Sequence, residues 1–478
     1  MQRLNFLQQH QVEKMHQATL QILNTIGIAT TSEKFKELLL NHGCKQAENR
    51  ITFPPEIVER YLKMAPSHFN LYGRDGETVV ELGKRKAYAQ SISGTPLIMD
   101  LETGERREYM LQDLANMCRL ADSLPSISII SCGVPKDVDA DIYMLMEITT
   151  MLRNTRKPLR LPIESGVELE YISQVLSVVC GNMDKFREKP CLYLEISPIS
   201  PLNFAKEQAE GIIGLAELGI PIGMIPCNMM GATGPMTLIG SVVQQNAEVV
   251  AGIVAAQMVR PGAKVVMSPR VTFMDMKTGV GLWAAPEMGI AGACSVELGH
   301  YYNLPVSVAG YSAASKIADQ QSGYERCYNA LLSALTGADI IAAAGALDNA
   351  LAASYTQLVL DDEIASMIGR TFRELDVSDD ALAVDVVADI VNSNTSFLEH
   401  IHTIKHLRKG ELWEPTLTNR LNYVMWAETK ETIEDRARKK ATKLLAANNE
   451  PLFDSYTDEE IEKIIIAAKQ KLAKKHKG

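Results

Sequence analysis

Polar side chains that follow buried-looking apolar runs are the residues of this sequence whose types best suit chemistry. Glu195 lies within CLYLEISPIS (191–200), Asn228 lies at the end of a second apolar run, and Arg270 follows a third. A carboxylate inside an apolar run is costly unless it is paired or used, so Glu195 fits either a function or an internal ion pair. Arg270 begins a loop that reaches residue 286, and loops of this length usually carry function.

Two further features fit an ordinary structural role as well as a functional one. Lys316 lies in the polar stretch SAASKIADQQ (312–321), where an amine can form a Schiff base, although a single lysine in such a loop is usually solvated. The glycines of CNMMGATGP (227–235) allow a ligand to approach the backbone. This stretch lacks the G-K-[ST] of a phosphate loop, however, and it also fits a plain turn from strand to helix.

Histidines and cysteines do not form a metal-binding pattern. His402 and His406 share one face of a predicted helix at 397–408, whereas His400 points elsewhere, and no carboxylate stands at the spacing of a zinc signature. The eight cysteines include no C-x-x-C pair, which is typical of core residues in a reduced protein. We therefore predict no bound metal. The predicted strand-end loops contain no histidine, which argues against a Ser-His or Cys-His nucleophile.

A repeating strand-then-helix pattern positions these residues. LPVSVAGY (304–311), the polar stretch, a helical pattern at 323–338 and a strand at 339–347 form one βαβ unit. Five more apolar runs of strand length precede it, separated by helical patterns: 127–135, 158–164, 191–200, 220–229 and 263–269. Strands without polar alternation belong to a parallel sheet that is covered by helices. We predict an α/β fold, a TIM (β/α)8 barrel whose eighth strand lies near 85–99 or escapes recognition, with an open doubly wound sheet as the alternative.

Mainly helical extensions flank the predicted barrel. We expect residues 1–123 to form an N-terminal extension of helices and hairpins, and residues 124–360 to form the barrel that carries the active site. Residues 361–478 are expected to form a C-terminal helical extension. This extension fits a lid, an oligomer interface or packing for the outside of the barrel.

Composition excludes several classes of partner. The 478 residues carry a net charge of −10, which gives no support to nucleic-acid or anionic-membrane binding, because both need a basic surface. No charge-free apolar run is long enough to span a bilayer, and residues 1–11 do not resemble a signal peptide. We expect a soluble, cytoplasmic protein.

Several motifs resemble one known family over nearly the whole chain. They are G-A-T-x-P within 231–235, N-A-E at 246–248, S-K-x-x-D-x-Q at 315–321, L-T-G-A-D at 335–339 and L-V-L-D-D-E at 358–363. The D-x-x-T-G-E-x-R stretch at 100–107 and H-T-x-x-H at 402–406 also fit. In this order they resemble the trimethylamine methyltransferase family.

The resemblance implies a TIM-barrel enzyme that transfers a methyl group from an amine to the cob(I)alamin of a separate corrinoid protein. Founding members carry pyrrolysine in the barrel, and this sequence has no such residue. Members without it resemble demethylases of quaternary amines, namely glycine betaine, proline betaine, carnitine and γ-butyrobetaine. The resemblance further implies that no cofactor is bound tightly and that the protein is a homo-oligomer.

Strand-end position, together with this substrate class, assigns roles to particular residues. Aromatic faces and carboxylates can hold a quaternary cation, and a guanidinium can bind a carboxylate bidentately. We assign catalytic roles to Glu195, Asp319 and Gln320, and substrate-binding roles to Tyr311, Trp283, Tyr355, Arg270 and Asn228. Two alternatives from other classes are a Schiff-base lyase that uses Lys316 and a betaine-binding protein without catalytic activity.

Overall fold

Eight parallel strands close into a barrel in the computed structural model, which describes residues 4–74, 76–163, 166–393, 395–447 and 451–475. Two four-stranded parallel sheets, β10-β11-β13-β15 and β18-β19-β6-β9, meet through parallel bridges between Ile130 and Leu159 and between Met267 and Val306. The strands are β6 (Tyr88–Ser91), β9 (Ile127–Ile129), β10 (Leu159–Pro162), β11 (Leu192–Ile196), β13 (Ile222–Met224), β15 (Val265–Met267), β18 (Ser307–Ala309) and β19 (Ile340–Ala344). The predicted TIM barrel is confirmed.

Strand β6 is the barrel strand that the sequence patterns had not identified, and it is the first barrel strand in the chain. It pairs in parallel with β19 on one side and β9 on the other, so it closes the ring from within the 85–99 region. The boundary predicted at 123 therefore needs correction, because β6 and the helix after it belong to the barrel. The boundary predicted at 360 falls inside the last barrel helix, which runs from Tyr355 to Thr371.

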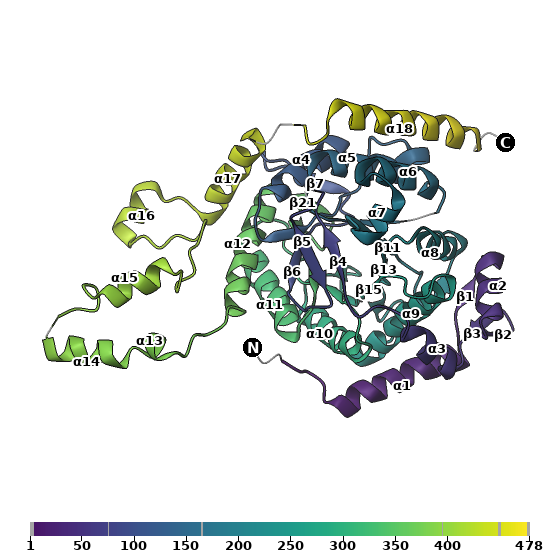
Figure 1. The fold of residues 1–478 in the computed structure, drawn as a ribbon, viewed down its shortest axis with the longest axis horizontal. Helices are drawn as coiled ribbons and strands as arrows, with labels where there is room; N and C mark the ends of the chain where they lie inside the picture. The colour runs from purple at the N-terminus through teal and green to yellow at the C-terminus, as the bar shows by residue number, and fades with distance from the viewer. Residues whose placement is uncertain (1–3, 75, 164–165, 394, 448–450, 476–478) are drawn as a thin grey trace.

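Helices surround the barrel and cover its outer face, as Figure 1 shows. The covering helices are α4 (Leu111–Asp122), α5 (Tyr143–Asn154) with the short η1 (Ala140–Ile142), α6 (Leu169–Cys180), α7 (Met183–Glu188), α8 (Lys206–Leu218), α9 (Leu238–Val259), α10 (Pro286–Tyr301), α11 (Gln320–Thr336) and α12 (Tyr355–Thr371). Helix α9 is long and apolar enough to cross a membrane, but 83% of its apolar window is buried inside the protein. Its composition therefore reflects a core position.

A hairpin plugs the amino-terminal end of the barrel. Strands β4 (Phe69–Tyr72) and β5 (Val79–Leu82) pair antiparallel, and Phe69, Leu71, Val80 and Leu82 pack against Ile129, Tyr193, Val266 and Ile340 of the barrel interior. The rest of the N-terminal region comprises α1 (Gln9–Thr25), β1 (Ala29–Thr30), α2 (Glu33–Asn41), β2 (Lys45–Ala47), β3 (Arg50–Thr52) and α3 (Pro55–Leu62). With this end closed, the carboxyl ends of the strands remain as the way into the barrel.

Short strands border the carboxyl ends of the barrel strands. They form two small sheets, β14-β16-β17 and β20-β21-β7-β8, while β12 (Asn203–Phe204) pairs with β1. Their bounds are β7 (Leu97–Met99), β8 (Arg106–Glu108), β14 (Met229–Met230), β16 (Thr272–Met274), β17 (Gly281–Leu282), β20 (Ala346–Leu347) and β21 (Ala352–Ser354). These sheets fix the loops that follow β6, β13, β15 and β19.

The C-terminal region is helical, as predicted, but contains two helices that the sequence patterns did not indicate. Its helices are α13 (Asp379–Leu382), α14 (Val384–Ser393), α15 (Ile401–Arg408), α16 (Tyr423–Thr429), α17 (Ile433–Ala447) and α18 (Ser455–Lys475). Helix α17 packs against α12 and α4, and α18 lies across α5 and α6 (Figure 1).

Gly299 tests the packing of helices onto the barrel. A Cβ at this position of α10 would lie 2.1 Å from Cγ2 of Val306, beside β18. We expect Gly299→Ala to lower the free energy of unfolding by about 1–3 kcal/mol, as overpacking does, and Val306→Ala in the same chain to recover part of the loss. Gly369→Ala in α12 is the control, because its Cβ would meet nothing within 4 Å. Equal urea-unfolding midpoints for both single variants would contradict this packing.

Candidate active site

A buried ion pair crosses the barrel interior between neighbouring strands. Arg160 of β10 donates a hydrogen bond from Nη2 to Oε2 of Glu195 of β11, and its Nη1 donates to Ser93 and, at 3.2 Å, to Ser131. Both charged side chains are at most 2% exposed. Gly223 on the adjacent strand leaves room for Glu195, since a Cβ there would lie 2.4 Å from Cγ of Glu195. Burial lowers the pKa of Arg160 to about 10, so the guanidinium stays charged at neutral pH.

The barrel interior around this pair contains polar atoms that have no hydrogen-bond partner among the described residues. Tyr193 donates a hydrogen bond of 3.0 Å to Oε1 of Gln90, which orients that amide across the barrel. Among the described residues, no hydrogen-bond partner is found for Gln90 Nε2, Arg160 Nε, Glu195 Oε1 or Ser268 Oγ, all of which are buried. Buried polar groups normally have partners, so these orphan atoms indicate a cavity that receives water or a ligand.

Arg270 brings a second positive charge to the end of β15, close to the first. Its Nη1 donates to the carbonyl oxygens of Ser307 (2.7 Å) and Pro269 (3.0 Å), and its Nη2 donates to Ser307 Oγ at 3.0 Å. Burial lowers the pKa of Arg270, as expected for a charge with little solvent around it. No carboxylate among the described residues lies within ion-pairing distance of this side chain. Among the residues that the structure describes, Arg270 is therefore a buried charge without a carboxylate to neutralise it.

Ser197 and Cys227 show where solvent reaches this region. Both are exposed although each follows a barrel strand, and Arg270 donates its backbone N–H to Pro226 O, next to Cys227 (3.1 Å). Burial among protein atoms raises the pKa of the Cys227 thiol, while Arg270 and Arg160 act in the opposite direction. The thiol thus lies at a point that solvent reaches although protein atoms surround it. We call the end of the barrel that is marked by Arg160, Glu195, Ser197, Cys227 and Arg270 the barrel mouth.

The predicted aromatic residues do not gather around the mouth. Trp283 lines a small cavity together with Arg270, but the other lining residues belong to α10, β18 and the loop after β15 and not to the mouth. Tyr311 is 1% exposed and packs in the main core, where burial raises its pKa and the charge of Asp361 adds to the effect. Tyr355 donates to Oδ1 of Asp113 at 2.8 Å, which ties it to the start of α4. The structure therefore assembles no three-ring cage from these residues.

Asn228 has a structural position at the start of its loop. Its Nδ2 donates to the carbonyl oxygen of Ser241 at 2.9 Å, and its own carbonyl accepts from the backbone N–H of Thr272 at 3.0 Å. These bonds join the loop after β13 to α9 and to β16. Its Oδ1 has no partner among the described residues. The side chain thus supports the rim of the barrel.

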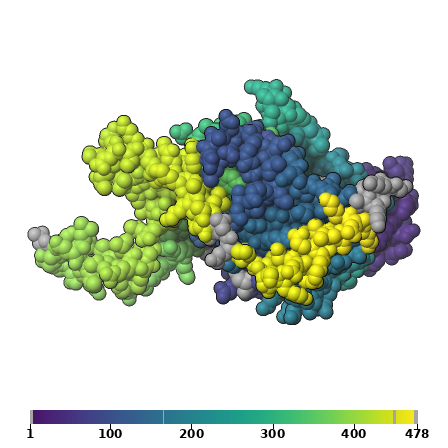
Figure 2. Space-filling view, turned by 90° about the horizontal axis from the view of Figure 1, so that it is seen from above, coloured from purple at the N-terminus to yellow at the C-terminus, as the bar shows by residue number. Residues whose placement is uncertain are grey.

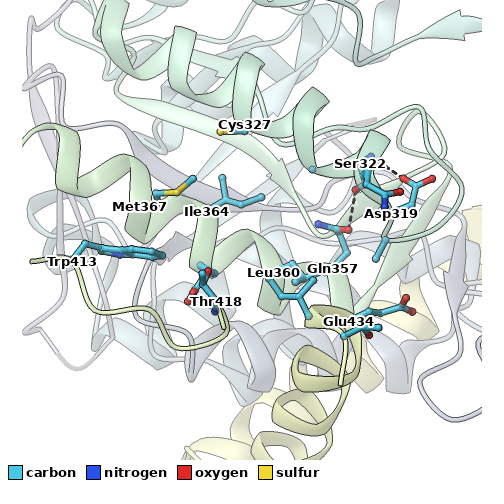
Figure 3. A pocket seen from close by; sticks show the side chains of 16 residues that line it. Asp319, Ser322, Cys327, Gln357, Leu360, Ile364, Met367, Trp413, Thr418 and Glu434 are labelled. Carbon is cyan, nitrogen blue, oxygen red and sulfur yellow. Dashed lines mark hydrogen bonds between the residues drawn. The ribbon is translucent and has the colours of Figure 1, made fainter. Parts of the chain in front are cut away.

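Asp319 and Gln320 line a different cavity, which lies outside the barrel. This cavity of about 510 Å³ is formed by α11, α12 and the C-terminal region, and no residue of a barrel strand lines it. Asp319 caps α11 by accepting from Ser322 N at 2.9 Å, and Ser322 donates to Gln357, as Figure 3 shows. Apolar side chains including Leu360, Ile364, Met367 and Trp413 form much of its wall (Figure 3). The two predicted catalytic residues therefore do not share a cavity with Glu195.

Lys316 has the environment of a solvated surface lysine. Its side chain is 66% exposed, its Nζ lies 3.5 Å from Oδ1 of Asp348, and it donates to the carbonyl oxygen of Ala314 at 2.8 Å. A Schiff-base lysine needs a desolvated, uncharged amine, which this position does not provide. The lyase alternative has no support in this geometry.

The sequence patterns assigned no role to Arg160 or Cys227, whereas Ser197 had been noted beside Glu195. Arg160 lies in PLRLPIE, where a charged residue between apolar neighbours is the same signal that identified Glu195 one strand later. Two opposite charges on successive parallel strands predict an internal pair, so this contact was accessible from the sequence. Cys227 gave no such signal, because cysteine is common in cores.

The family model described as "Trimethylamine methyltransferase (MTTB)" matches residues 1–473. The chain belongs to the trimethylamine methyltransferase family. It is 30% identical to a glycine betaine methyltransferase of Desulfitobacterium hafniense (strain Y51) over 466 residues, which is 97% of both chains. It is 32% identical to a trimethylamine methyltransferase of D. hafniense (strain DSM 10664 / DCB-2) over 82% of this chain and 80% of that one.

A solved structure shows the same fold. The Methanosarcina barkeri monomethylamine methyltransferase superposes with a TM-score of 0.55 at 11% sequence identity, covering 92% of this chain and 89% of that one. At this identity the match speaks for the fold alone. The family match and the two relatives identify the protein as a methyltransferase, and its barrel mouth contains two buried arginines and one glutamate.

The buried ion pair in this methyltransferase can be tested by its effect on the free energy of unfolding. We expect Glu195→Leu and Arg160→Met each to lower the free energy of unfolding by about 3–5 kcal/mol, because each leaves an unpaired buried charge. The double variant should unfold near the wild-type urea concentration, since it removes both charges. A double variant as unstable as the two losses combined would show that the side chains do not form a mutual pair.

Proposed function

We propose that this methyltransferase demethylates a quaternary amine that carries a carboxylate, and that the methyl acceptor is cob(I)alamin on a separate corrinoid protein. The substrate class comprises glycine betaine, proline betaine, carnitine and γ-butyrobetaine. The buried guanidinium of Arg270, which has no carboxylate partner among the described residues, carries this proposal, because a substrate carboxylate would supply a negative charge. The similarity to a glycine betaine methyltransferase over 97% of both chains supports it.

The chemistry of a quaternary amine suits a site without a proton donor. When the N–CH3 bond breaks, the methyl group passes to the reduced cobalt, and the bonding electron pair stays on nitrogen. The leaving group is a neutral tertiary amine, so it needs no proton. The remaining task of the protein is to align cobalt, methyl carbon and nitrogen and to exclude water, and such positioning supplies much of the rate in transfers of this kind.

The mouth offers a suitable contact for the cationic end of the substrate. Glu195 keeps Oε1 without a partner while Oε2 holds Arg160, so one carboxylate oxygen is free to face a trimethylammonium group. Trp283 shares a small cavity with Arg270 beside α10, so it is the aromatic residue of the predicted set that lies nearest to this guanidinium. In this arrangement Arg270 takes the carboxylate of the substrate and Glu195 takes its cation. Arg160 holds Glu195 in place from the side.

Access for the corrinoid protein follows from which end of the barrel is open. The β4-β5 hairpin fills the amino-terminal end, whereas Ser197 and Cys227 are exposed at the carboxyl ends of the strands. A methyl acceptor on another protein must therefore reach the substrate through the mouth. This requirement agrees with an enzyme that binds no cofactor tightly and meets its acceptor only during transfer.

A methyl-transfer assay across a small panel of amines tests the proposed reaction. Purified protein alone should leave every betaine unchanged, while added cob(I)alamin, free or on its carrier protein, should be converted to methylcobalamin with at least one carboxylated quaternary amine. The absorbance change of the corrinoid measures the reaction. Transfer from trimethylamine together with failure of all quaternary amines would overturn the substrate class.

Arg270→Ala tests the proposed contact with the carboxylate. Loss of a charge-assisted hydrogen bond costs about 1.5–3 kcal/mol, so we expect KM for the active betaine to rise roughly 10- to 100-fold. The rate with tetramethylammonium, which has no carboxylate, should change little. Arg153→Ala, which removes a surface ion pair with Asp458 and Glu462, is the control and should leave both rates unchanged. Equal effects of Arg270→Ala on both substrates would remove Arg270 from the site.

A further inference from the structure

The C-terminal region contains an arm that leaves the body of the protein and returns. The arm comprises residues 372–432 and carries α13, α14, α15 and α16. It begins after α12, extends well beyond the ring of barrel helices, and comes back at α17, which packs on α12 (Figure 1). In the space-filling view it projects from one side of the body as two lobes that stand apart from each other (Figure 2).

The arm has a defined shape of its own. Lys405 of α15 lies 2.6 Å from Oδ1 of Asp380, and His402 Nε2 lies 3.0 Å from the carbonyl oxygen of the same residue. Arg373 donates to the carbonyl oxygen of Gly410, which joins the outgoing and returning segments. The helices nevertheless bury almost nothing. Helices α13, α15 and α16 contain no buried residue, and α14 contains one, Ile390.

Large apolar side chains cover the arm and face solvent. Among the described residues, the arm holds 16 of the 36 exposed large apolar side chains of the protein, although it is 61 residues long. They include Val384, Val387 and Val391, whose spacing places them along one side of α14, and Ile401 and Ile404 on α15. Helices this short need tertiary packing to be stable in water, and monomers rarely expose apolar patches larger than a few hundred Å². The arm therefore needs a covering partner.

We propose that the arm packs against the same arm of a second copy of this chain. An apolar surface of this extent needs cover throughout the life of the protein, and obligate partners have the more apolar interfaces. A methyl-acceptor protein has to dissociate after each transfer, whereas a second copy is present whenever the chain is. A two-fold axis through the arms brings identical surfaces together, as in most dimers.

Charge and position support a second copy over another protein. Asp385 and Asp389 on α14 and Arg408 on α15 have no ion-pair partner among the described residues, so one arm offers both signs to its twin. The position at which the arm leaves the body also supports a second copy as the partner. Helix α12 starts at the carboxyl ends of the strands and runs back along the barrel, so the arm departs from the end opposite the mouth. Its returning part lies along α12 and α11, where Trp413 and Thr418 line the outer cavity and not the barrel mouth.

Sedimentation velocity of the full-length protein at several concentrations tests this arrangement. We expect wild type to sediment as a dimer of 52.6 kDa chains or as a multiple of dimers. Val387→Asp/Val391→Asp should halve the mass and should leave the far-ultraviolet circular dichroism nearly unchanged. Ile466→Asp, which changes an equally exposed apolar residue of α18, is the matched control and should sediment as wild type.

A second double variant keeps the proposal testable if the first one fails to fold. Tyr423→Asp/Val424→Asp changes the other lobe of the arm and should also halve the mass. A wild type that is monomeric at every concentration would overturn the proposal. Arm variants that keep the wild-type mass would overturn it as well. If such variants also failed to transfer methyl groups to the carrier-bound corrinoid, the arm would be assigned to the acceptor protein instead.

Discussion

The constraint on which the structure depends is the cost of placing charge inside a closed barrel. Arg160, Glu195 and Arg270 all lie in the interior or at its rim, where little water is present to stabilise them. Arg160 and Glu195 neutralise each other, whereas among the described residues Arg270 has only hydrogen bonds to neutral groups. The binding of a zwitterion would complete this arrangement, since it brings one charge of each sign into the mouth.

The surrounding elements keep that interior both dry and reachable. At the amino-terminal end, the β4-β5 hairpin packs apolar side chains against the barrel interior. At the opposite end, Arg326 of α11 pairs with Asp361 of α12 at 2.8 Å and also donates to the carbonyl oxygens of Tyr311 and Ala346. This buried contact fixes the loops after β18 and β19, and thereby part of the rim. These contacts fix part of the rim before any substrate binds.

Much of the fold was predictable because its physical signals are local. Seven of the eight barrel strands were identified as apolar runs between helices, as strands covered on both faces must be. The eighth, Tyr88–Ser91, has the sequence YAQS, and its Gln90 and Ser91 bond to other residues of the barrel, so it lacks the apolar signature. Helices α16 and α17 escaped notice because short or highly charged segments show weak periodicity. The arm's exposed apolar side chains look like core residues in sequence.

The site was less predictable, because strand-end position does not fix the direction of a side chain. Glu195 and Arg270 lie at the mouth, since their strands set their direction. Tyr311, Tyr355, Asp319 and Gln320 follow strands too, but the loops turn them toward α4, α11 and α12. That outcome depends on tertiary contacts such as the one between Tyr355 and Asp113, two residues that are 242 positions apart in the chain. The motif at 315–321 thus serves the start of α11 and the outer cavity.

Two cysteines allow a direct measurement of where the substrate binds. Cys227 lies at the barrel mouth and Cys327 lines the cavity between α11 and α12, so each thiol reports on one of the two candidate sites. The rate of alkylation of each thiol by iodoacetamide can be followed by peptide mass spectrometry, with and without saturating glycine betaine or the betaine that proves active. The account predicts that the ligand slows modification of Cys227 and leaves that of Cys327 unchanged. Protection of Cys327 with no effect on Cys227 would contradict it and would place the substrate outside the barrel.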